Sequence, residues 1–412
     1  MQNKRKTIND PVLGFNSLQS DLLFDLMEHP YFQRLRRIKQ LGLSCLVYPG
    51  ANHTRFEHVL GATFLMQSAI ASLKDKGVKI TADEAEAVKA AILLHDVGHG
   101  AFSHALEYAI VDGLVHEEMS LLLMEEMNLQ FGGRLAMAIA IFKGEYHKHF
   151  LHQLVSSQLD VDRLDYLARD SFYSGVAEGT ISADRIIKMM NVKDNQLVIE
   201  EKAIYSIEKF LISRRLMYWQ VYLHKTVLSA EILLEKVLKR AKELALAGEK
   251  LFATPSLEIF LYNKISLANF MQKDKFMERH LLDVFASIED DDILASIKQW
   301  QFHPDYILSH LSRCIVNRKL YKVQMHSAPV SASWLSEIKE HIKKQYGVDE
   351  NELGYFVIER EFTNKAYIAN DDNISILMKS GEVKEFSRAS DISLSNLSQV
   401  VRKQVICFAS YE

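Results

Sequence analysis

The 412-residue sequence predicts a mainly α-helical protein with a smaller α/β domain at its C-terminus. Three observations lead to this fold class. Apolar residues recur three and four positions apart from residue 20 to about residue 240, which is the spacing of amphipathic helices. The chain contains only 6 prolines, so few of these helices are expected to be interrupted. After about residue 313, short runs of β-branched and aromatic residues appear instead, and these are typical of strands.

The first half of the chain is expected to consist of helices joined by short polar loops. The expected helices span residues 20–29, 32–41, 56–73, 82–95, 116–127, 134–142 and 161–170. Residues 191–201 alternate around a turn-like Asp194-Asn195 pair and therefore predict a small hairpin between helices. Residues 203–246 carry an apolar stripe interrupted by polar residues, which indicates one long helix that faces both the core and a polar site.

Residues 254–312 are expected to form further short helices, with Pro255 and Pro304 at their starts. Strands are expected within residues 320–327, 354–362, 374–378 and 404–411, and a helix within residues 334–347 that Gly347 closes. The chain therefore divides into residues 1–312, a helical domain with a helical extension, and residues 313–412, a small α/β domain without a recognised motif. We expect this second domain to have a structural or oligomer-bracing role.

The composition restricts the classes of protein that fit. A formal net charge of −4 argues against a protein that binds polyanions over its whole surface, so a phosphate site would have to be a local basic cluster. The three cysteines are widely spaced, which fits a reducing compartment and argues against disulfides or a cysteine zinc site. Neither a signal peptide nor a membrane-spanning run is evident. We expect a cytoplasmic protein without membrane contact, in which any metal is held by histidine and carboxylate.

His95 and Asp96 stand at the end of an apolar helix, in the segment LLHDVGHGAFSH. An adjacent His–Asp pair supplies a nitrogen and a carboxylate oxygen, a donor set suited to Fe, Mn, Co, Ni or Zn. The glycines allow a sharp turn, so His99 and His104 can approach the same cavity. The alternative is a histidine that caps the C-terminus of a helix, followed by polar residues that solvate a loop.

Two other segments favour a metal site. RFEH opens another expected helix, and DVDRLDYLARD is an acidic amphipathic stretch in which Asp162, Tyr166 and Asp170 share one helix face. On its own, this stretch is more simply explained as a solvated charged face with pairing to Arg163 and Arg169. Two nitrogens and two carboxylates could surround one metal and leave positions open for water. The four residues that offer these ligands are His58, His95, Asp96 and Asp162.

The order His…His-Asp…Asp resembles the metal site of the HD superfamily. The resemblance covers most of residues 6–240, and the segments that carry it are QRLRRIKQLG, VYPGANHTRFEHVLG, LLHDVGHGAFSH, VHEEMS, DVDRLDYLARD and RRLMYWQVYLHKT. They occur in the order seen in deoxynucleoside triphosphate triphosphohydrolases of the sterile-alpha-motif/HD type and, more distantly, in bacterial dGTPases. The resemblance implies an HD-domain helical bundle that hydrolyses a dNTP to deoxynucleoside and tripolyphosphate. It also implies one divalent transition metal (Fe, Mn, Zn, Ni or Co), with Mg²⁺ allowed alongside the nucleotide.

The resemblance further implies catalytic roles at four positions, namely His99, His104, Glu107 and His116. His104 is suited to protonate the leaving oxygen, and Glu107, three residues further on, can orient it and raise its pKa. The sterile-alpha-motif/HD type has Asp at the position of Glu107, whereas bacterial dGTPases have Glu.

By the same motif match, residues near the phosphates are Arg55, Arg163, Arg214 and Lys225, and residues around the sugar are Gln40, Leu41, Tyr166, Asp170 and Tyr222. Arginine suits phosphate because its planar fork meets two oxygens at once. Ordinary surface charge remains the alternative for the arginines. Core packing remains the alternative for Leu41 and Tyr222.

A region near the N-terminus partly matches the segment that binds activating nucleotides at a subunit interface in the relatives. The matching residues are Lys6, Asn9, Glu28, Gln33 and Arg36. Helix capping and salt bridges explain Glu28 and Arg36 equally well. The resemblance implies a homo-oligomer, a dimer or a tetramer. Two other functions stay open, namely hydrolysis of a nucleoside monophosphate or cyclic nucleotide, and a nucleotide- or nucleic-acid-binding oligomer with a vestigial site.

Overall fold

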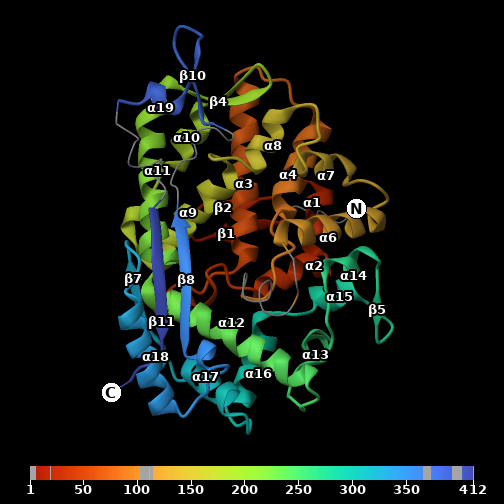
Figure 1. The fold of residues 1–412 in the computed structure, drawn as a ribbon. Coiled ribbons are helices and arrows are strands. Elements are labelled where there is room, and N and C mark those ends of the chain that lie inside the picture. Colours follow the sequence, from red (N-terminus) through yellow and green to blue (C-terminus); the bar gives the residue numbers. More distant parts are fainter. Residues whose placement is uncertain are drawn as a thin grey trace.

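The computed structural model describes residues 6–18, 20–102, 111, 115–364, 373–391 and 401–411. The described part is mainly α-helical, as predicted (Figure 1). Two predicted catalytic residues, His104 and Glu107, lie outside the described residues. Leucine, isoleucine and phenylalanine side chains from most of the helices form one continuous buried core.

The helical body surrounds α3 (Arg55–Asp75), which is buried around most of its circumference. Its neighbours α4 (Ala82–Leu94) and α9 (Val161–Ser174) pack along it. Other helices of this body, among the described residues, are α1 (Asp21–Glu28), α6 (His116–Gln130), α7 (Ala136–Phe142), α8 (His149–Val155) and α10 (Ala183–Met189). The Glu57 carboxylate accepts a hydrogen bond from the backbone N–H of Thr54 at 2.6 Å and fixes the start of α3. The start of α3, the end of α4 and the start of α9 are far apart in the sequence, but in the packed structure they lie close together.

The predicted helix over residues 32–41 is wrong. The chain forms a short helix, α2 (Pro30–Gln33), and a 3₁₀ turn, η1 (Arg34–Arg37), and then extends. It extends because it pairs with the segment before α3, where Arg55 N donates to Ile38 O at 2.9 Å and Gln40 N donates to His53 O at 3.0 Å. A second 3₁₀ turn, η2 (Gly42–Leu46), follows. This pairing brings Gln40 beside the start of α3.

The single long helix predicted over residues 203–246 is also wrong, because it is two helices. α11 (Ile204–Met217) ends in a π-helical turn, η5 (Tyr218–Tyr222), and α12 (Lys225–Leu246) begins after a break. The His224 ring accepts a hydrogen bond from Thr226 N at 3.2 Å and caps α12. Turns of the π type occur frequently at functional sites, because the extra residue changes the direction of the side chains.

Two hairpins flank the helical body. The predicted hairpin is confirmed as β3 (Met190–Lys193) and β4 (Gln196–Glu200), joined by Asp194 and Asn195 with φ of +50° and +63°. β4 also pairs in parallel with β9 (Ser375–Leu377), and β10 (Val383–Glu385) completes this four-stranded sheet. An N-terminal hairpin, β1 (Thr7–Asp10) and β2 (Gly14–Ser17), was not predicted.

The C-terminal half contains the expected helices and strands and, in addition, elements that were not predicted: a short hairpin, β5 (Lys275–Phe276) and β6 (Arg279–His280), the strand β10 and the helix α19 (Phe386–Ala389). The helices are α13 (Pro255–Tyr262), α14 (Leu267–Met271), α15 (Leu281–Ala286), α16 (Asp290–Trp300), α17 (Tyr306–Val316), α18 (Ala332–Tyr346) and α19. Pro255 begins α13 as predicted, whereas Pro304 precedes Asp305, the residue that caps α17. Gly347 closes α18 with φ of +64°, as predicted.

A three-stranded antiparallel sheet forms the centre of this C-terminal region. Its strands, in the order β7 (Lys322–His326), β11 (Val401–Phe408) and β8 (Val357–Asn364), confirm three of the predicted strands. β7 packs on α12, and Figure 1 shows the sheet next to that helix. The sheet therefore lies close to the end of the π-helical turn that carries Tyr222.

Candidate active site

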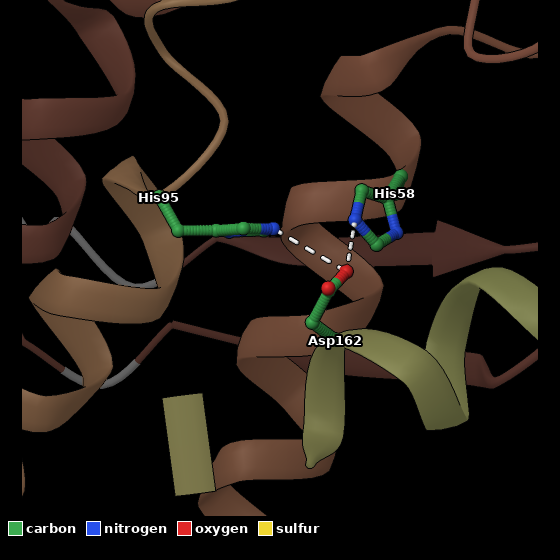
Figure 2. A group of neighbouring side chains, drawn as sticks. All are labelled: His58, His95 and Asp162. Carbon is green, nitrogen blue, oxygen red and sulfur yellow. Dashed lines mark ion pairs between the residues drawn. The ribbon is translucent and has the colours of Figure 1, made fainter. Parts of the chain in front are cut away.

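Three predicted metal ligands converge from three helices. His58 comes from the first turns of α3, His95 follows the last residue of α4, and Asp162 lies in the first turn of α9. Their ligand atoms all lie within 4.8 Å of one another. Nε2 of His58 and Nε2 of His95 lie 3.0 and 3.4 Å from Oδ1 of Asp162. Figure 2 shows both rings directed at this carboxylate.

The second nitrogen of each histidine is held by an acceptor, so that Nε2 faces the centre. Nδ1 of His58 lies 2.9 Å from Asp165, and Nδ1 of His95 lies 2.6 Å from the carbonyl oxygen of Ile92. Nε2 of His95 is buried and makes no regular hydrogen bond among the described residues, although it faces Asp162 and Asp96 at 3.4 Å each. Two buried, oriented imidazoles that face carboxylates are a donor set suited to a divalent transition metal. The residues therefore fit such a metal.

The charges of the cluster are strongly coupled. Burial opposes protonation of His58, but its hydrogen bonds to Asp162 and Asp165 raise its pKa to about 10. Burial likewise opposes ionisation of Asp162, yet the two histidines lower the pKa of this carboxyl. Because a metal requires the neutral imidazole nitrogen, metal binding would release a proton from the cluster.

Asp96, the fourth predicted ligand, lies beside this group and is ion-paired with Arg55. Its Oδ1 is 3.4 Å from Nε2 of His95, and its Oδ2 is 3.8 Å from Nε2 of His58. Burial opposes ionisation of Asp96, but the Arg55 guanidinium holds the pKa of this carboxyl well below its usual range. The structure thus brings all four predicted ligands together, and Asp96 also contacts a predicted phosphate-binding arginine.

Gly98 explains how the HDVGHG segment reaches α6. Its N–H donates to Oγ of Ser120 at 2.9 Å, and that hydroxyl donates to the carbonyl oxygen of His95 at 2.7 Å. A Cβ atom on Gly98 would lie 2.1 Å from the backbone nitrogen of Ser120, so only glycine allows this approach.

The close contact between Gly98 and α6 brings together two predicted catalytic residues, His99 and His116. The rings of His99 and His116 are stacked with centroids 4.0 Å apart, and Nε2 of His99 lies 3.3 Å from Asp96. Burial, and then the nearby Arg55 charge, lower the pKa of His99 to about 3. The surroundings of His99 thus disfavour its protonated form.

A cavity of about 510 Å³ adjoins the cluster at Arg55. Gln40, Leu41 and Tyr222, which the resemblance places around the sugar, line it. Oε1 of Gln40 is buried and has no hydrogen-bond partner among the described residues. The cavity continues to Arg360 on β8, so the C-terminal region forms part of its wall.

Asp170 is the centre of a polar network beside the cavity. Its two carboxylate oxygens lie 2.8 Å from Nε2 of His53 and 2.8 Å from the hydroxyl of Tyr222. The His53 ring stacks on Tyr173 with centroids 4.4 Å apart. Tyr166 lies between the network and the metal ligands, with its ring centroid 6.4 Å from that of Tyr222 and 6.4 Å from that of His58.

Two predicted phosphate residues, Arg163 and Arg214, lie near Tyr166. Nε of Arg163 donates to the carbonyl oxygen of Ser157 at 2.6 Å and lies 3.2 Å from Asp160. Burial and, more weakly, the Arg163 charge lower the pKa of Arg214. Two neighbouring guanidinium groups make a suitable site for a polyanion.

The predicted activator residues form two separate pairs. Nζ of Lys6 lies 3.6 Å from Glu28, and Nε of Arg36 donates to Oε1 of Gln33 at 2.9 Å. Arg36 also stacks over the Phe56 ring at 3.5 Å. Asn9 is exposed on β1. A salt bridge, the alternative stated for Glu28, accounts for its contact with Lys6, whereas Arg36 is held by an amide hydrogen bond and an aromatic ring. Nucleotide binding here stays a prediction.

Sequence reasoning missed four buried residues of the site, namely His53, Asp165, Arg169 and Asp10. Pairing with neighbouring arginines was expected only as part of a solvated charged face, whereas the Asp165–Arg169 pair is fully buried. No local pattern indicates Asp10, because its partner is far along the chain.

Models of two families match the chain, the HD domain over residues 55–170 and the HD associated region over residues 181–282. The chain is 32% identical over 403 residues to the uncharacterized protein YwfO of Bacillus subtilis, covering 94% of this chain and 88% of that protein. The chain belongs to the HD superfamily of phosphohydrolases.

Solved structures and curated relatives agree with this assignment. This HD phosphohydrolase matches the crystal structure of a phosphohydrolase from Bacteroides thetaiotaomicron with a TM-score of 0.94 and 52% identity, over 98% of this chain and 100% of that chain. It is 31% identical over 264 residues to the deoxynucleoside triphosphate triphosphohydrolase SAMHD1 of Homo sapiens, which is 53% of this chain and 42% of that protein. Within the described ranges, no helix is long and apolar enough to cross a membrane.

Proposed function

We propose that this HD phosphohydrolase hydrolyses deoxynucleoside triphosphates to a deoxynucleoside and tripolyphosphate. One observation carries the proposal: a cavity of about 510 Å³ is lined by Arg55, which pairs with the predicted ligand Asp96, and by Gln40, whose buried Oε1 has no hydrogen-bond partner among the described residues. A nucleoside fills such a volume, and an unpartnered acceptor favours a ligand that has a hydroxyl group. The curated SAMHD1 relatives, which are named for this activity, support the same substrate class.

His58, His95 and Asp162, with Asp96 beside them, would hold one divalent metal. The chemistry that a bound metal supplies is polarisation of a phosphoryl oxygen and stabilisation of the charge that develops on it. The other steps are assigned to side chains of the protein.

Arginine side chains bind the triphosphate in this proposal. Arg55 holds the phosphate nearest the metal ligands, since it already contacts Asp96. Arg163 and Arg214 take the outer phosphates, where they neutralise charge and hold the triphosphate so that its α-phosphorus is in place for attack by water.

The sugar lies between Gln40 and Tyr222. Oε1 of Gln40 accepts a hydrogen bond from the 3'-hydroxyl, and the Tyr222–Asp170 pair forms the opposite wall. Leu41 and Tyr222 fill the space that a 2'-hydroxyl would need, which favours deoxynucleotides.

In the reaction, water adds to the α-phosphorus and the bond from this phosphorus to O5' breaks. A proton must pass to O5' as the deoxynucleoside leaves, and a positioned acid accelerates this step. The sequence assigns the acid to His104 with Glu107, outside the described residues, while the stacked His99 and His116 adjoin Asp96.

The test is product analysis on the metal-reloaded enzyme. Chelator-treated protein is reloaded with Mn²⁺, Fe²⁺ or Mg²⁺ and incubated with each dNTP and with GTP, alone and in pairs. We expect tripolyphosphate and deoxynucleoside from wild type and from Asp184→Ala, an exposed control, but not from Asp162→Ala. Orthophosphate as the product, or four intact dNTPs, would overturn the proposal and favour a monophosphate or cyclic nucleotide as substrate.

A further inference from the structure

A buried chain of charged groups joins the N-terminal hairpin to a metal ligand. Asp10, the last residue of β1, lies 2.9 Å from the Arg169 guanidinium of α9. Arg169 binds Asp165 through two nitrogens at 2.8 and 2.9 Å. Oδ2 of Asp165 lies 2.9 Å from Nδ1 of His58, whose Nε2 faces Asp162. The side chains of the four linked groups, from Asp10 to His58, are at most 4% exposed.

Because these four side chains are buried, each charged group depends on its neighbour in the chain for a partner. A fully buried guanidinium requires carboxylate partners, because an unpaired charge in the interior is strongly unfavourable. Arg169 holds both oxygens of Asp165, and Oδ2 of Asp165 in turn faces Nδ1 of His58. An acceptor at Nδ1 sets the tautomer and the orientation of a histidine ligand.

Asp165 and Arg169 pack tightly against the backbone of α3 at Gly61. A Cβ atom on Gly61 of α3 would lie 2.0 Å from Oδ1 of Asp165 and 2.1 Å from a terminal nitrogen of Arg169. Asp165 and Arg169 therefore press directly on the backbone of α3, one turn beyond His58. Figure 1 shows the hairpin beside α3 and α9, where Asp10 can close the chain of contacts.

We propose that Asp10 and Arg169 are positioning residues for His58, so that docking of the N-terminal hairpin determines the metal affinity of the HD site. The hairpin is no metal ligand itself. It acts through Asp165, which directs Nε2 of His58 to the metal position. The proposal rests on the metal site of the proposed function and is independent of which nucleotide is hydrolysed.

The two oxygens of Asp10 have different partners, which makes a sharp variant available. Oδ1 accepts hydrogen bonds from the backbone N–H groups of Val12 and Leu13, both at 2.8 Å, and shapes the turn of the hairpin. Oδ2 faces Arg169. Asp10→Asn retains an oxygen for the turn and replaces the charged oxygen by an amide that repels Arg169. The control is Asn16→Ala, which removes a hairpin hydrogen bond of 3.1 Å to Leu13 and leaves the charged chain intact.

The experiment measures Mn²⁺ binding to chelator-treated protein by isothermal titration calorimetry, with thermal unfolding of the metal-free protein alongside. We expect Asp10→Asn to weaken Mn²⁺ binding by roughly 10- to 100-fold, the range seen for groups that support metal ligands. Asn16→Ala should bind Mn²⁺ like wild type. If Asp10→Asn does not fold, Arg169→Lys, which retains the charge but loses the two-nitrogen contact to Asp165, replaces it with the same expectation.

A spectroscopic measurement separates positioning from a general loss of stability. ¹⁵N NMR of histidine-labelled metal-free protein should show a changed Nδ1–H signal for His58 in Asp10→Asn and an unchanged one in Asn16→Ala. Wild-type Mn²⁺ affinity in a folded Asp10→Asn would overturn the proposal. Equal weakening in Asn16→Ala would also overturn it, because loss of hairpin stability would then explain the effect.

Discussion

Gly98→Ala tests whether the close contact between the HDVGHG segment and α6 builds the site. The added methyl group would lie 2.1 Å from the backbone nitrogen of Ser120 and 2.5 Å from the carbonyl oxygen of His116. Both neighbours are backbone atoms, which have no rotamer to change. The segment and the start of α6 must therefore move apart.

The expected size of the effect follows from the contact. Real Cβ atoms essentially never lie under 3.0 Å from another heavy atom, so a separation of roughly 1 Å is required. Forced expansion of a packed region costs about 1–3 kcal/mol of stability. The shift also separates His116 from His99 and Asp96, and a displacement of about 1 Å at a catalytic group reduces the rate by roughly 100-fold.

The assay is steady-state dNTP hydrolysis together with the thermal unfolding of metal-loaded protein. Gly354→Ala is the matched control, because its Cβ meets no atom within 4 Å and its backbone is not in the left-handed region. We expect Gly98→Ala to lose stability and most of its activity, and Gly354→Ala to resemble wild type. Equal activity in the two variants would refute the argument that this contact positions His116.

Three further predictions concern the cavity, the C-terminal wall and the pH dependence of stability. Tyr222→Phe removes the hydroxyl that binds Asp170 at 2.8 Å, so the KM for dNTPs should rise about tenfold; an unchanged KM would contradict a sugar site there. Arg360→Ala removes a cavity side chain that pairs with Glu235, and should change the KM for dNTPs while Mn²⁺ affinity stays the same; unaltered KM values for all four dNTPs would exclude the C-terminal region from the site. Burial opposes ionisation of Glu84, but hydrogen bonds from Lys148, Thr81 and Tyr146 lower its pKa to about 2 from 4.5. The ionised Glu84 carboxylate stabilises the folded state against unfolding; this stabilisation is fully present above pH 4.5 and is lost as the pH falls through about 2. In urea unfolding, Lys148→Ala should therefore be less stable than wild type at neutral pH, and the difference should shrink below pH 4.5; a constant difference would contradict this account.

Local periodicity predicted the helices that carry the metal ligands. α4 is a largely apolar stretch and α9 an amphipathic one, and both have clear starts. The end of α4, where His95 lies, and the start of α9, where Asp162 lies, could therefore be located from the sequence. The turn chemistry of Asp194 and Asn195 was equally local and was confirmed. These features depend on neighbours within one or two turns of chain.

The errors arose where distant segments determine the backbone. The helix predicted through Gln40 ends early because Ile38 and Gln40 pair with the segment that precedes α3. The long helix breaks at the π-helical turn, where His224 caps a new helix. Periodicity carries no information on such contacts, because it describes only one segment at a time.

The supporting residues of the site were missed for the same reason. Asp165 and Arg169 look like an ordinary ion pair on a helix, and their role depends on the position of His58 in another helix. Asp10 stands in a short segment without helical periodicity, and its partner is Arg169. A residue that only positions a metal ligand is not part of the ligand motif, so no sequence motif identifies it.

The most direct test is ³¹P NMR of timed samples from a single dNTP incubated with the Mn²⁺-loaded enzyme, recorded after a chelating resin has removed the paramagnetic Mn²⁺. We expect tripolyphosphate signals in the earliest samples, without pyrophosphate or orthophosphate, and none with Asp162→Ala. Accumulation of pyrophosphate or orthophosphate as the first product, or an unchanged dNTP spectrum, would contradict the assignment of this HD phosphohydrolase as a dNTP triphosphohydrolase.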